Sequence, residues 1–407
     1  MKKTLLTVFM SSSVMLLTAC GGGDGSDWNF SGGDGIPKNN IKDPVVNVTA
    51  YTKDDMSGYA ADSQLMTYKM LGVNNKEVTA TSLVFVPKTV QPANGWPIVV
   101  WAHGTTGVAD KCAPSQQGLQ GTQVLLQQLL TAGYVVIAPD YEGLGAEGNH
   151  PFLNLKSEAF SITDAVVATR DYLSRQGKKA APQWMTVGHS QGGHAALGAA
   201  QYASRAQLDY KGTIAIAPAS NLAAILQGGE NSVIGQPANI QIPVLAQLDM
   251  FTSLIVAGMQ GHDISVSYAQ VFKSHTAAIA PIAERECGNI VGDALGYGMG
   301  QYASSNNNSL NGYGRNQDNF MSIPIINNFL FKDSQPGTVK LNQSVIIYQG
   351  GLDQVVPKAA TDLLKASAEA KGTTIQYRTN ANWTHSTVYT ANINNFVADV
   401  KSLVPTQ

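Results

Sequence analysis

Short apolar runs alternate with amphipathic stretches along most of the chain. Residues 97–102 are almost continuously apolar, as in a strand that is buried on both faces of a sheet. Further apolar runs predict strands at residues 134–138, 184–187, 213–217, 344–348 and 374–378. Apolar positions at helical spacing predict helices at residues 116–132, 158–176, 191–204, 358–371 and 389–403. Strands separated by helices of this length indicate βαβ units, and therefore a mainly parallel sheet with helices on both faces.

Two regions depart from this alternation. Residues 64–71 and 79–86 follow each other closely and predict an antiparallel pair at one edge of the sheet. Residues 221–341 contain helical segments at 242–259 and 266–279, followed by a stretch rich in Gly, Asn and Ser. Because the strand pattern resumes afterwards, we interpret this region as a largely helical insertion that covers the site, a cap. A second independent domain is the alternative.

The first twenty residues resemble the export signal of a bacterial lipoprotein. Lys2 and Lys3 precede an apolar segment, residues 4–17, that is too short to span a bilayer comfortably. The segment leads into Leu-Thr-Ala-Cys, which puts Cys20 at the lipid-attachment position of a lipobox. The resemblance implies that residues 1–19 are removed and that Cys20 carries a lipid anchor. The glycine that follows Cys20 favours the outer membrane. An ordinary signal peptide with an incidental cysteine is the alternative.

The segment after the lipobox is rich in Gly and Asp. Residues 20–43 contain little that could form a core, so we expect a flexible tether between the anchor and a folded domain at residues 44–407. Charged residues make up 13% of the chain and its formal net charge is −2. The chain has no excess of basic residues, which nucleic-acid-binding proteins usually have, so no nucleic-acid partner is expected.

The cysteine count indicates one disulfide. The chain has three cysteines, Cys20, Cys112 and Cys287. If Cys20 carries a lipid, an even pair remains in an oxidising compartment, where disulfides persist. We therefore predict a bridge between Cys112 and Cys287. Two buried free thiols are the alternative.

Residues 188–192 form a G-x-S-x-G motif around Ser190. The motif directly follows the strand predicted at 184–187 and directly precedes a helix, which is the setting of a nucleophile elbow in the α/β-hydrolase fold. The flanking glycines allow a cramped turn that presents the hydroxyl group at the top of the sheet, near the positive end of the following helix. We therefore predict that Ser190 is a catalytic nucleophile.

A serine nucleophile requires a base and an acid, and in this fold the acid and then the histidine follow the serine along the chain. His385 lies beyond the last long strands, in the loop before the final helix. Asp353 leaves the C-terminal end of the strand at 344–348, from where its carboxylate can reach the His385 ring. It would fix the tautomer of the histidine and stabilise the imidazolium. A helix N-cap role for Asp353 is the alternative.

The tetrahedral intermediate of acyl transfer needs two backbone donors for its oxyanion. One is expected to be the N–H group of Gln191, the residue after the nucleophile. The other is expected in the loop 103–107, which follows the strand at 97–102. We choose Thr105 as this second donor, with Thr106 as the alternative.

The other histidines and the absent motifs narrow the chemistry. We expect packing or hydrogen-bonding roles for His103, His189 and His194, and surface or substrate-wall roles for His150, His262 and His275. No H-x-x-x-H or paired Cys/His spacing occurs, so no metal is expected. No phosphate-binding or dinucleotide motif follows a strand, so no organic cofactor is expected.

Three segments resemble a known family: residues 188–193, the loop that begins at His103, and residues 140–153. They are similar to the secreted lipase family of α/β hydrolases, and the resemblance runs from about residue 60 to the C-terminus. It implies hydrolysis of acyl esters, triacylglycerols among them, with a helical cap over the acyl pocket. Relatives include lipases, short-chain esterases and acyl transferases, so the substrate stays open.

Other readings of the same residues remain. The triad serves any acyl transfer, so a peptidase or lactamase is compatible with it. A non-catalytic lipoprotein that binds a ligand would be expected to lack a triad residue, whereas Ser190, Asp353 and His385 are all present in order.

Overall fold

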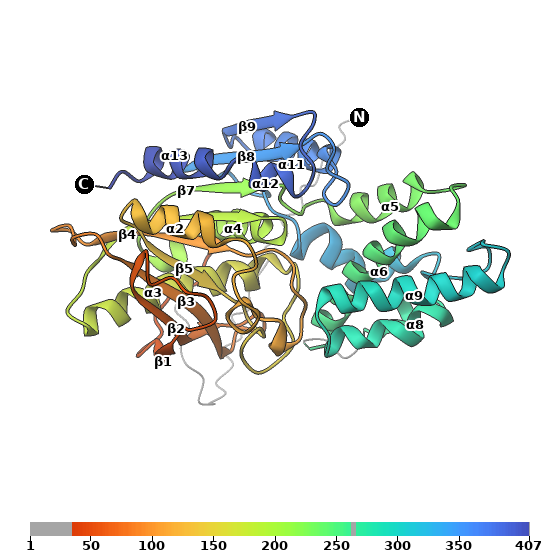
Figure 1. The fold of residues 1–407 in the computed structure, drawn as a ribbon, viewed down its shortest axis with the longest axis horizontal. Helices are drawn as coiled ribbons and strands as arrows, with labels where there is room; N and C mark the ends of the chain where they lie inside the picture. The colour runs from red at the N-terminus through yellow and green to blue at the C-terminus, as the bar shows by residue number, and fades with distance from the viewer. Residues whose placement is uncertain (1–34, 262–265, 407) are drawn as a thin grey trace, which may run out of the picture.

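The computed structural model describes residues 35–261 and 266–406, and Figure 1 shows a central sheet beside a group of helices. Within these residues the sheet has nine strands in the order β1-β2-β3-β5-β4-β6-β7-β8-β9. Neighbours are parallel from β5 to β9 in this order. The strands β1, β2 and β3 pair antiparallel, and β3 joins β5 in the same sense. The predicted mainly parallel sheet with an antiparallel edge is confirmed.

The central strands are apolar on both faces, because helices cover both. All seven residues of β4 are buried, for example. The strands are Val45–Ala50 (β1), Ala60–Leu71 (β2), Glu77–Pro87 (β3), Trp96–Ala102 (β4), Val135–Pro139 (β5), Ala180–His189 (β6), Asp209–Ile216 (β7), Ser344–Gly350 (β8) and Ile375–Asn380 (β9).

Two apolar clusters join the helices to the two faces of the sheet. Ile98 and Val100 face a cluster with α3, α4 and α11, whereas Val99 and Trp101 face a cluster with α2 and α13. This alternation is the period of two that a strand dictates. The helices on the two faces are Gln123–Thr131 (α2), Leu155–Arg175 (α3), Gln191–Gln201 (α4), Lys358–Ala370 (α11) and Ile393–Leu403 (α13), with the short helices Pro114–Gln117 (α1) and Thr387–Thr390 (α12).

Three predicted helices are interrupted. The segment 116–132 divides into α1 and α2, because Gly118 and Gly121 have φ angles of 89° and 87°, in the left-handed region that ends a helix. The segment 389–403 divides into α12 and α13 at Ala391 and Asn392, without a left-handed residue. The cap segment 266–279 contains two short helices, Tyr268–Val271 (α7) and Ser274–Ile279 (α8).

The cap lies between β7 and β8 in the chain and at the right of Figure 1. Besides α7 and α8 it comprises Leu222–Ser232 (α5), Ala238–Gln260 (α6), Gly288–Ser305 (α9) and Pro324–Asn328 (α10). Its apolar core includes Leu245 and Leu295, and also Phe152 and Val356 from outside the cap. The cap therefore packs directly on the sheet-bearing part of the protein rather than through a linker.

Helix α6 is the one helix among the described residues that is long and apolar enough to cross a membrane. Its most apolar window is 61% buried inside the protein. Length and composition of this kind also occur in core helices of globular proteins, and α6 packs against α9 within the cap.

The disulfide between Cys112 and Cys287 is present and joins the cap to the sheet-bearing part. Cys287 is the N-cap residue of α9, and Cys112 is fully buried. A β-bridge between Gly107 and Cys287 adjoins it. The start of the cap helix α9 is therefore fixed against the loop that follows β4.

The packed chain begins within the segment predicted as a tether. The side chain of Asn39 donates to Asp164 at 2.8 Å, and Arg205 donates to the Pro37 carbonyl at 2.9 Å. Arg205 and Asp164 form a fully buried ion pair, which anchors residues 37–39 to α3. The signal segment 1–19 and the lipidation residue Cys20 lie outside the described residues, as does His262.

Candidate active site

Ser190 forms the turn between β6 and α4. Its φ and ψ angles are 60° and −121°, a conformation that non-glycine residues rarely adopt. A Cβ atom on Gly188 would lie 2.0 Å from the Gly192 carbonyl oxygen, and one on Gly192 would lie 1.9 Å from the Ala102 carbonyl oxygen. Both positions therefore require glycine, and the strained turn is held by the close approach of three backbone segments.

Asp353 and His385 meet in the loops after β8 and β9. The Nδ1–H group of His385 donates to Asp353 Oδ2 at 2.8 Å. The other carboxylate oxygen accepts from the backbone N–H groups of Val355 and Val356, at 2.9 and 2.8 Å. Asp353 is 5% exposed. These bonds fix the carboxylate and the histidine tautomer, and they leave His385 Nε2 as the ring nitrogen available for proton transfer.

His189 holds the loop that carries His385. Its Nε2–H group donates to the His385 carbonyl at 2.9 Å, and the two rings lie 4.5 Å apart. Burial lowers the pKa of His189 to about 3, and the nearby His385 adds to the shift. His189 is therefore neutral at physiological pH. Its place agrees with the hydrogen-bonding role predicted for it.

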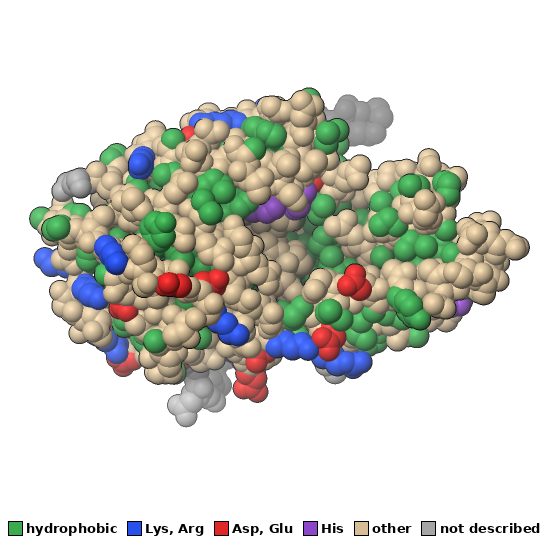
Figure 2. Space-filling model, viewed as in Figure 1, with side chains coloured by type: hydrophobic (Ala, Val, Ile, Leu, Met, Phe, Trp, Pro, Cys, Tyr) green, Lys and Arg blue, Asp and Glu red, His purple; other side chains and the backbone are tan. Residues whose placement is uncertain are grey.

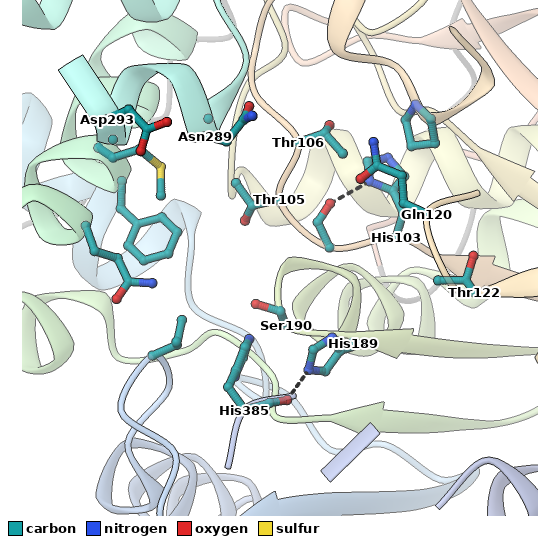
Figure 3. Close-up of a pocket in the computed structure, with 18 of the residues that line it drawn as sticks. His103, Thr105, Thr106, Gln120, Thr122, His189, Ser190, Asn289, Asp293 and His385 are labelled. Atoms are coloured by element: carbon teal, nitrogen blue, oxygen red, sulfur yellow. Dashed lines mark hydrogen bonds between the residues drawn. The ribbon is translucent and has the colours of Figure 1, made fainter. Parts of the chain in front are cut away.

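The loop 103–107 is held by contacts on both sides. Tyr141 donates its hydroxyl to the His103 carbonyl at 3.1 Å and stacks on the His103 ring at 4.2 Å. Gly288 of the cap donates to the Thr106 carbonyl at 2.8 Å. Burial lowers the pKa of His103 to about 4, so its ring stays neutral. Figure 3 shows Thr105 near Ser190 and Thr106 farther from it.

A buried polar network surrounds the Gln191 side chain. Its amide Nε2 donates to Glu158 Oε1 at 2.8 Å and lies 2.8 Å from His150 Nε2. Glu158, His150 and His194 are all fully buried, and Gln191 is 1% exposed. Gln191 is the first residue of α4, and the first N–H groups of a helix have no partner within the helix. The network therefore fixes the residue whose backbone N–H is the predicted oxyanion donor.

His194 links this network to the backbone of Ser334. Its Nδ1 atom lies 2.6 Å from Glu158 Oε2, and its Nε2 atom lies 2.9 Å from the Ser334 carbonyl oxygen. Burial would raise the pKa of Glu158, but its contacts with His194 and His150 lower it to about 2. The Glu158 carboxylate is therefore ionised although it is fully buried.

Glu158 was not predicted from the sequence. It occupies one position of an amphipathic helix, α3, where a glutamate usually faces water. A partial signal exists, because His194 follows Ser190 by one helical turn and needs a buried partner on the neighbouring helix. Within the described residues, no group of three or more His, Cys, Asp or Glu side chains is placed to hold a metal ion.

A cavity of about 860 Å³ opens at Ser190 between the sheet-bearing part and the cap. Figure 2 shows the hollow on the molecular surface, with histidine side chains at its rim. Ser190, His385 and Thr105 line it, and Figure 3 shows the Ser190 and His385 side chains at its floor. The far wall comes from α6 and α9 of the cap, through residues such as Met250 and Asn289. The three predicted triad residues are therefore brought to one cavity, two by lining it and Asp353 through its bond to His385.

A second, smaller cavity of about 40 Å³ adjoins the first. Ser190, Gln191 and Thr105 line its mouth. The remainder of its wall is apolar and is formed by Phe152, Leu153, Ala219, Leu222, Ile225, Leu226, Phe251, Ile255, Val355 and Val356. Ser190 therefore lies where a smaller, mainly apolar cavity meets a larger one.

The sheet order, the strained serine turn and the paired aspartate and histidine define an α/β hydrolase. The chain belongs to the secretory lipase family, which matches residues 115–398. Membership in this family places the protein among the carboxylic ester hydrolases, and it agrees with export from the cell. A search of curated proteins by sequence found no match.

Solved structures share the fold at low sequence identity. A hydrolase from Legionella pneumophila is 15% identical over 89% of this chain and 99% of its own, with a TM-score of 0.70. Lipase A of Candida antarctica is 17% identical over 90% and 84%, with a TM-score of 0.66. The rice cell wall degrading esterase LipA of Xanthomonas oryzae is 18% identical over 88% and 97%, with a TM-score of 0.64.

Proposed function

We propose that the protein hydrolyses carboxylic esters through a Ser190–His385–Asp353 triad and an acyl-enzyme intermediate. His385 Nε2 takes the proton of the Ser190 hydroxyl as the oxygen attacks the ester carbonyl carbon. The same proton then passes to the alcohol oxygen as the C–O bond breaks. A water molecule, deprotonated by His385, next attacks the acyl-serine and releases the acid. Asp353 stays ionised throughout and stabilises the imidazolium of His385.

The oxyanion of each tetrahedral intermediate would be stabilised by two backbone N–H groups. Gln191 is one donor, at the positive end of α4, where the helix dipole adds to the hydrogen bond. Thr105 is the other, since it lines both cavities next to Ser190. Removal of one such donor typically costs about 10² to 10³ in kcat.

The observation that carries this proposal is the 2.8 Å bond between His385 Nδ1 and Asp353 Oδ2 in the wall of the cavity that Ser190 also lines. The test is hydrolysis of p-nitrophenyl esters from acetate to palmitate by soluble protein that starts after Cys20, compared with its Ser190→Ala variant. We expect activity in the first and none in the second. A folded wild type without activity on any ester would exclude the proposal.

We also propose that Cys20 becomes the N-terminal residue after removal of residues 1–19 and carries a lipid that anchors the protein in the outer membrane. The lipobox sequence supports this location. Mass spectrometry of the mature N-terminal peptide tests it. A diacylglyceryl thioether on Cys20 is expected, and Cys20→Ala should release the protein from the membrane fraction. An unmodified thiol on Cys20 would indicate an ordinary secreted enzyme.

A further inference from the structure

The two cavities that meet at Ser190 differ in which catalytic groups line them. Ser190, Thr105, Phe251 and Val355 line both. His385 lines only the larger cavity, whereas Gln191 lines only the smaller one. The site therefore has a histidine side and a side away from the histidine, with the serine between them.

This asymmetry determines which part of an ester enters which cavity. His385 must protonate the alcohol oxygen as it leaves, so the alcohol has to lie on the histidine side. The acyl chain then extends to the opposite side of Ser190, into the smaller cavity. Apart from Ser190, Gln191 and Thr105, that cavity is lined by apolar side chains, as an acyl chain requires, whereas the larger one combines apolar side chains such as Met250 with polar ones such as Gln120 and Asn289.

The volume of the smaller cavity limits the acyl chain. This cavity has about 40 Å³ of free space, against about 860 Å³ in the larger cavity, so only a short acyl chain fits without a change in its wall. A longer chain would have to displace a side chain of the wall.

Phe251 is the largest of the four side chains that line both cavities. It projects from α6, lines both spaces and stacks on Phe152 with ring centroids 6.4 Å apart. Unlike the neighbouring Leu254 and Ile255, it is only half-buried. Its ring therefore closes the acyl side without being a central part of the cap core.

We propose that the enzyme is an esterase for short acyl groups, bound in the smaller cavity, with Phe251 as the residue that limits acyl length. The inference rests on the proposed ester hydrolysis at Ser190 and specifies its substrate class. If this inference is correct, the enzyme does not hydrolyse esters of long acyl chains efficiently.

The experiment measures kcat/KM for p-nitrophenyl acetate, butanoate, octanoate and dodecanoate with the soluble protein that starts after Cys20. Because the leaving group is constant, the ratios report on the acyl side alone. Wild type should prefer butanoate over octanoate by at least about tenfold. Phe251→Ala should raise the octanoate-to-butanoate ratio at least about tenfold, and Ala219→Val, which narrows the cavity, should lower the butanoate-to-acetate ratio.

A matched control is Phe331→Ala, the same substitution at a phenylalanine that is 57% exposed and lines neither cavity. It should leave every acyl ratio unchanged. The orientation is tested with 4-methylumbelliferyl butanoate, which has a larger leaving group. Ala219→Val should not change its rate relative to p-nitrophenyl butanoate by more than about twofold, because the alcohol lies in the other cavity.

Three results would overturn the inference. Wild type that prefers octanoate or dodecanoate would show that the acyl chain lies elsewhere, while ester hydrolysis at Ser190 would stand. Identical acyl ratios in Phe251→Ala and Phe331→Ala would remove the role of Phe251. Loss of hydrolysis on every ester, with no labelling of Ser190 by a fluorophosphonate, would exclude the proposed function together with this inference.

Discussion

Replacement of both Cys112 and Cys287 by alanine is expected to destabilise the protein strongly. The two residues are 175 positions apart, so the disulfide closes nearly half of the folded chain into one loop. The chain-entropy relation for a loop of this length gives about 5 kcal/mol at 25 °C. This is a large fraction of the 5–15 kcal/mol that is typical of the stability of a whole domain.

The loss should also affect the site, because the bridge fixes the start of α9 next to the loop 103–107. Gly288, the residue after Cys287, donates to the Thr106 carbonyl at 2.8 Å. Without the disulfide, only this backbone contact, the adjoining bridge of Gly107 with residue 287 and the Lys111–Glu286 ion pair hold the start of α9 to the Thr105 loop. Activity of the variant on p-nitrophenyl butanoate should therefore decline at lower urea concentration than its global unfolding.

Urea unfolding monitored by circular dichroism measures the difference. Wild type with reductant should match the double variant, and the variant should not respond to reductant. The dependence of the unfolding free energy on urea concentration should be steeper in the variant, because its unfolded chain is more expanded. A variant within about 1 kcal/mol of wild type, combined with a wild type that reductant does not affect, would refute the argument from loop closure.

Three further outcomes are expected. Gly192→Ala places a Cβ atom 1.9 Å from the Ala102 carbonyl oxygen, so the serine turn must shift and kcat should fall at least about 100-fold with the circular dichroism spectrum retained. His194→Leu leaves the buried Glu158 carboxylate without its partner at 2.6 Å and should cost about 3–5 kcal/mol in urea unfolding, whereas an unchanged midpoint would mean that this contact does not stabilise the fold. His103 has a pKa of about 4 in the folded protein, so below pH 6.5 the unfolded chain binds a proton that the native protein does not, and stability falls as pH falls. This contribution is about 2 kcal/mol at pH 5 relative to pH 7, and His103→Gln should lack it when unfolding free energies at the two pH values are compared.

The sequence is informative where local geometry forces residue identity. The serine turn needs glycine at 188 and 192, and both appear in the motif together with a strand before it and a helix after it. Asp353 and His385 follow the last strands, whose ends lie on one edge of a parallel sheet. The pairing of Cys112 with Cys287 was predicted from the number of cysteines and from the oxidising compartment expected for the protein. Each of these rests on a short-range rule.

Features that depend on packing between distant segments were not predictable in the same way. Glu158 has the pattern of an exposed helical residue, and only the approach of α4 makes it a buried anion beside His194. The break between α1 and α2 at Gly118 could not be predicted, because apolar residues keep their helical spacing across it. The cavity volumes depend on side chains from α5, α6 and the loops around β8, so the acyl length could not be inferred before the fold was known.

The order of the elements along the chain determines when the site is completed. β6, the Ser190 turn and β7 precede the cap, whereas β8 and β9, which lead to Asp353 and His385, follow it. β7 and β8 nevertheless pair directly, beginning at Gly212 and Ser344. The two strands are neighbours in the sheet although the whole cap separates them along the chain. Pairings between such distant segments form slowly. In the proposed mechanism, Ser190 therefore has no base until β8 and β9 have docked, and a chain that has not reached that point cannot hydrolyse an ester.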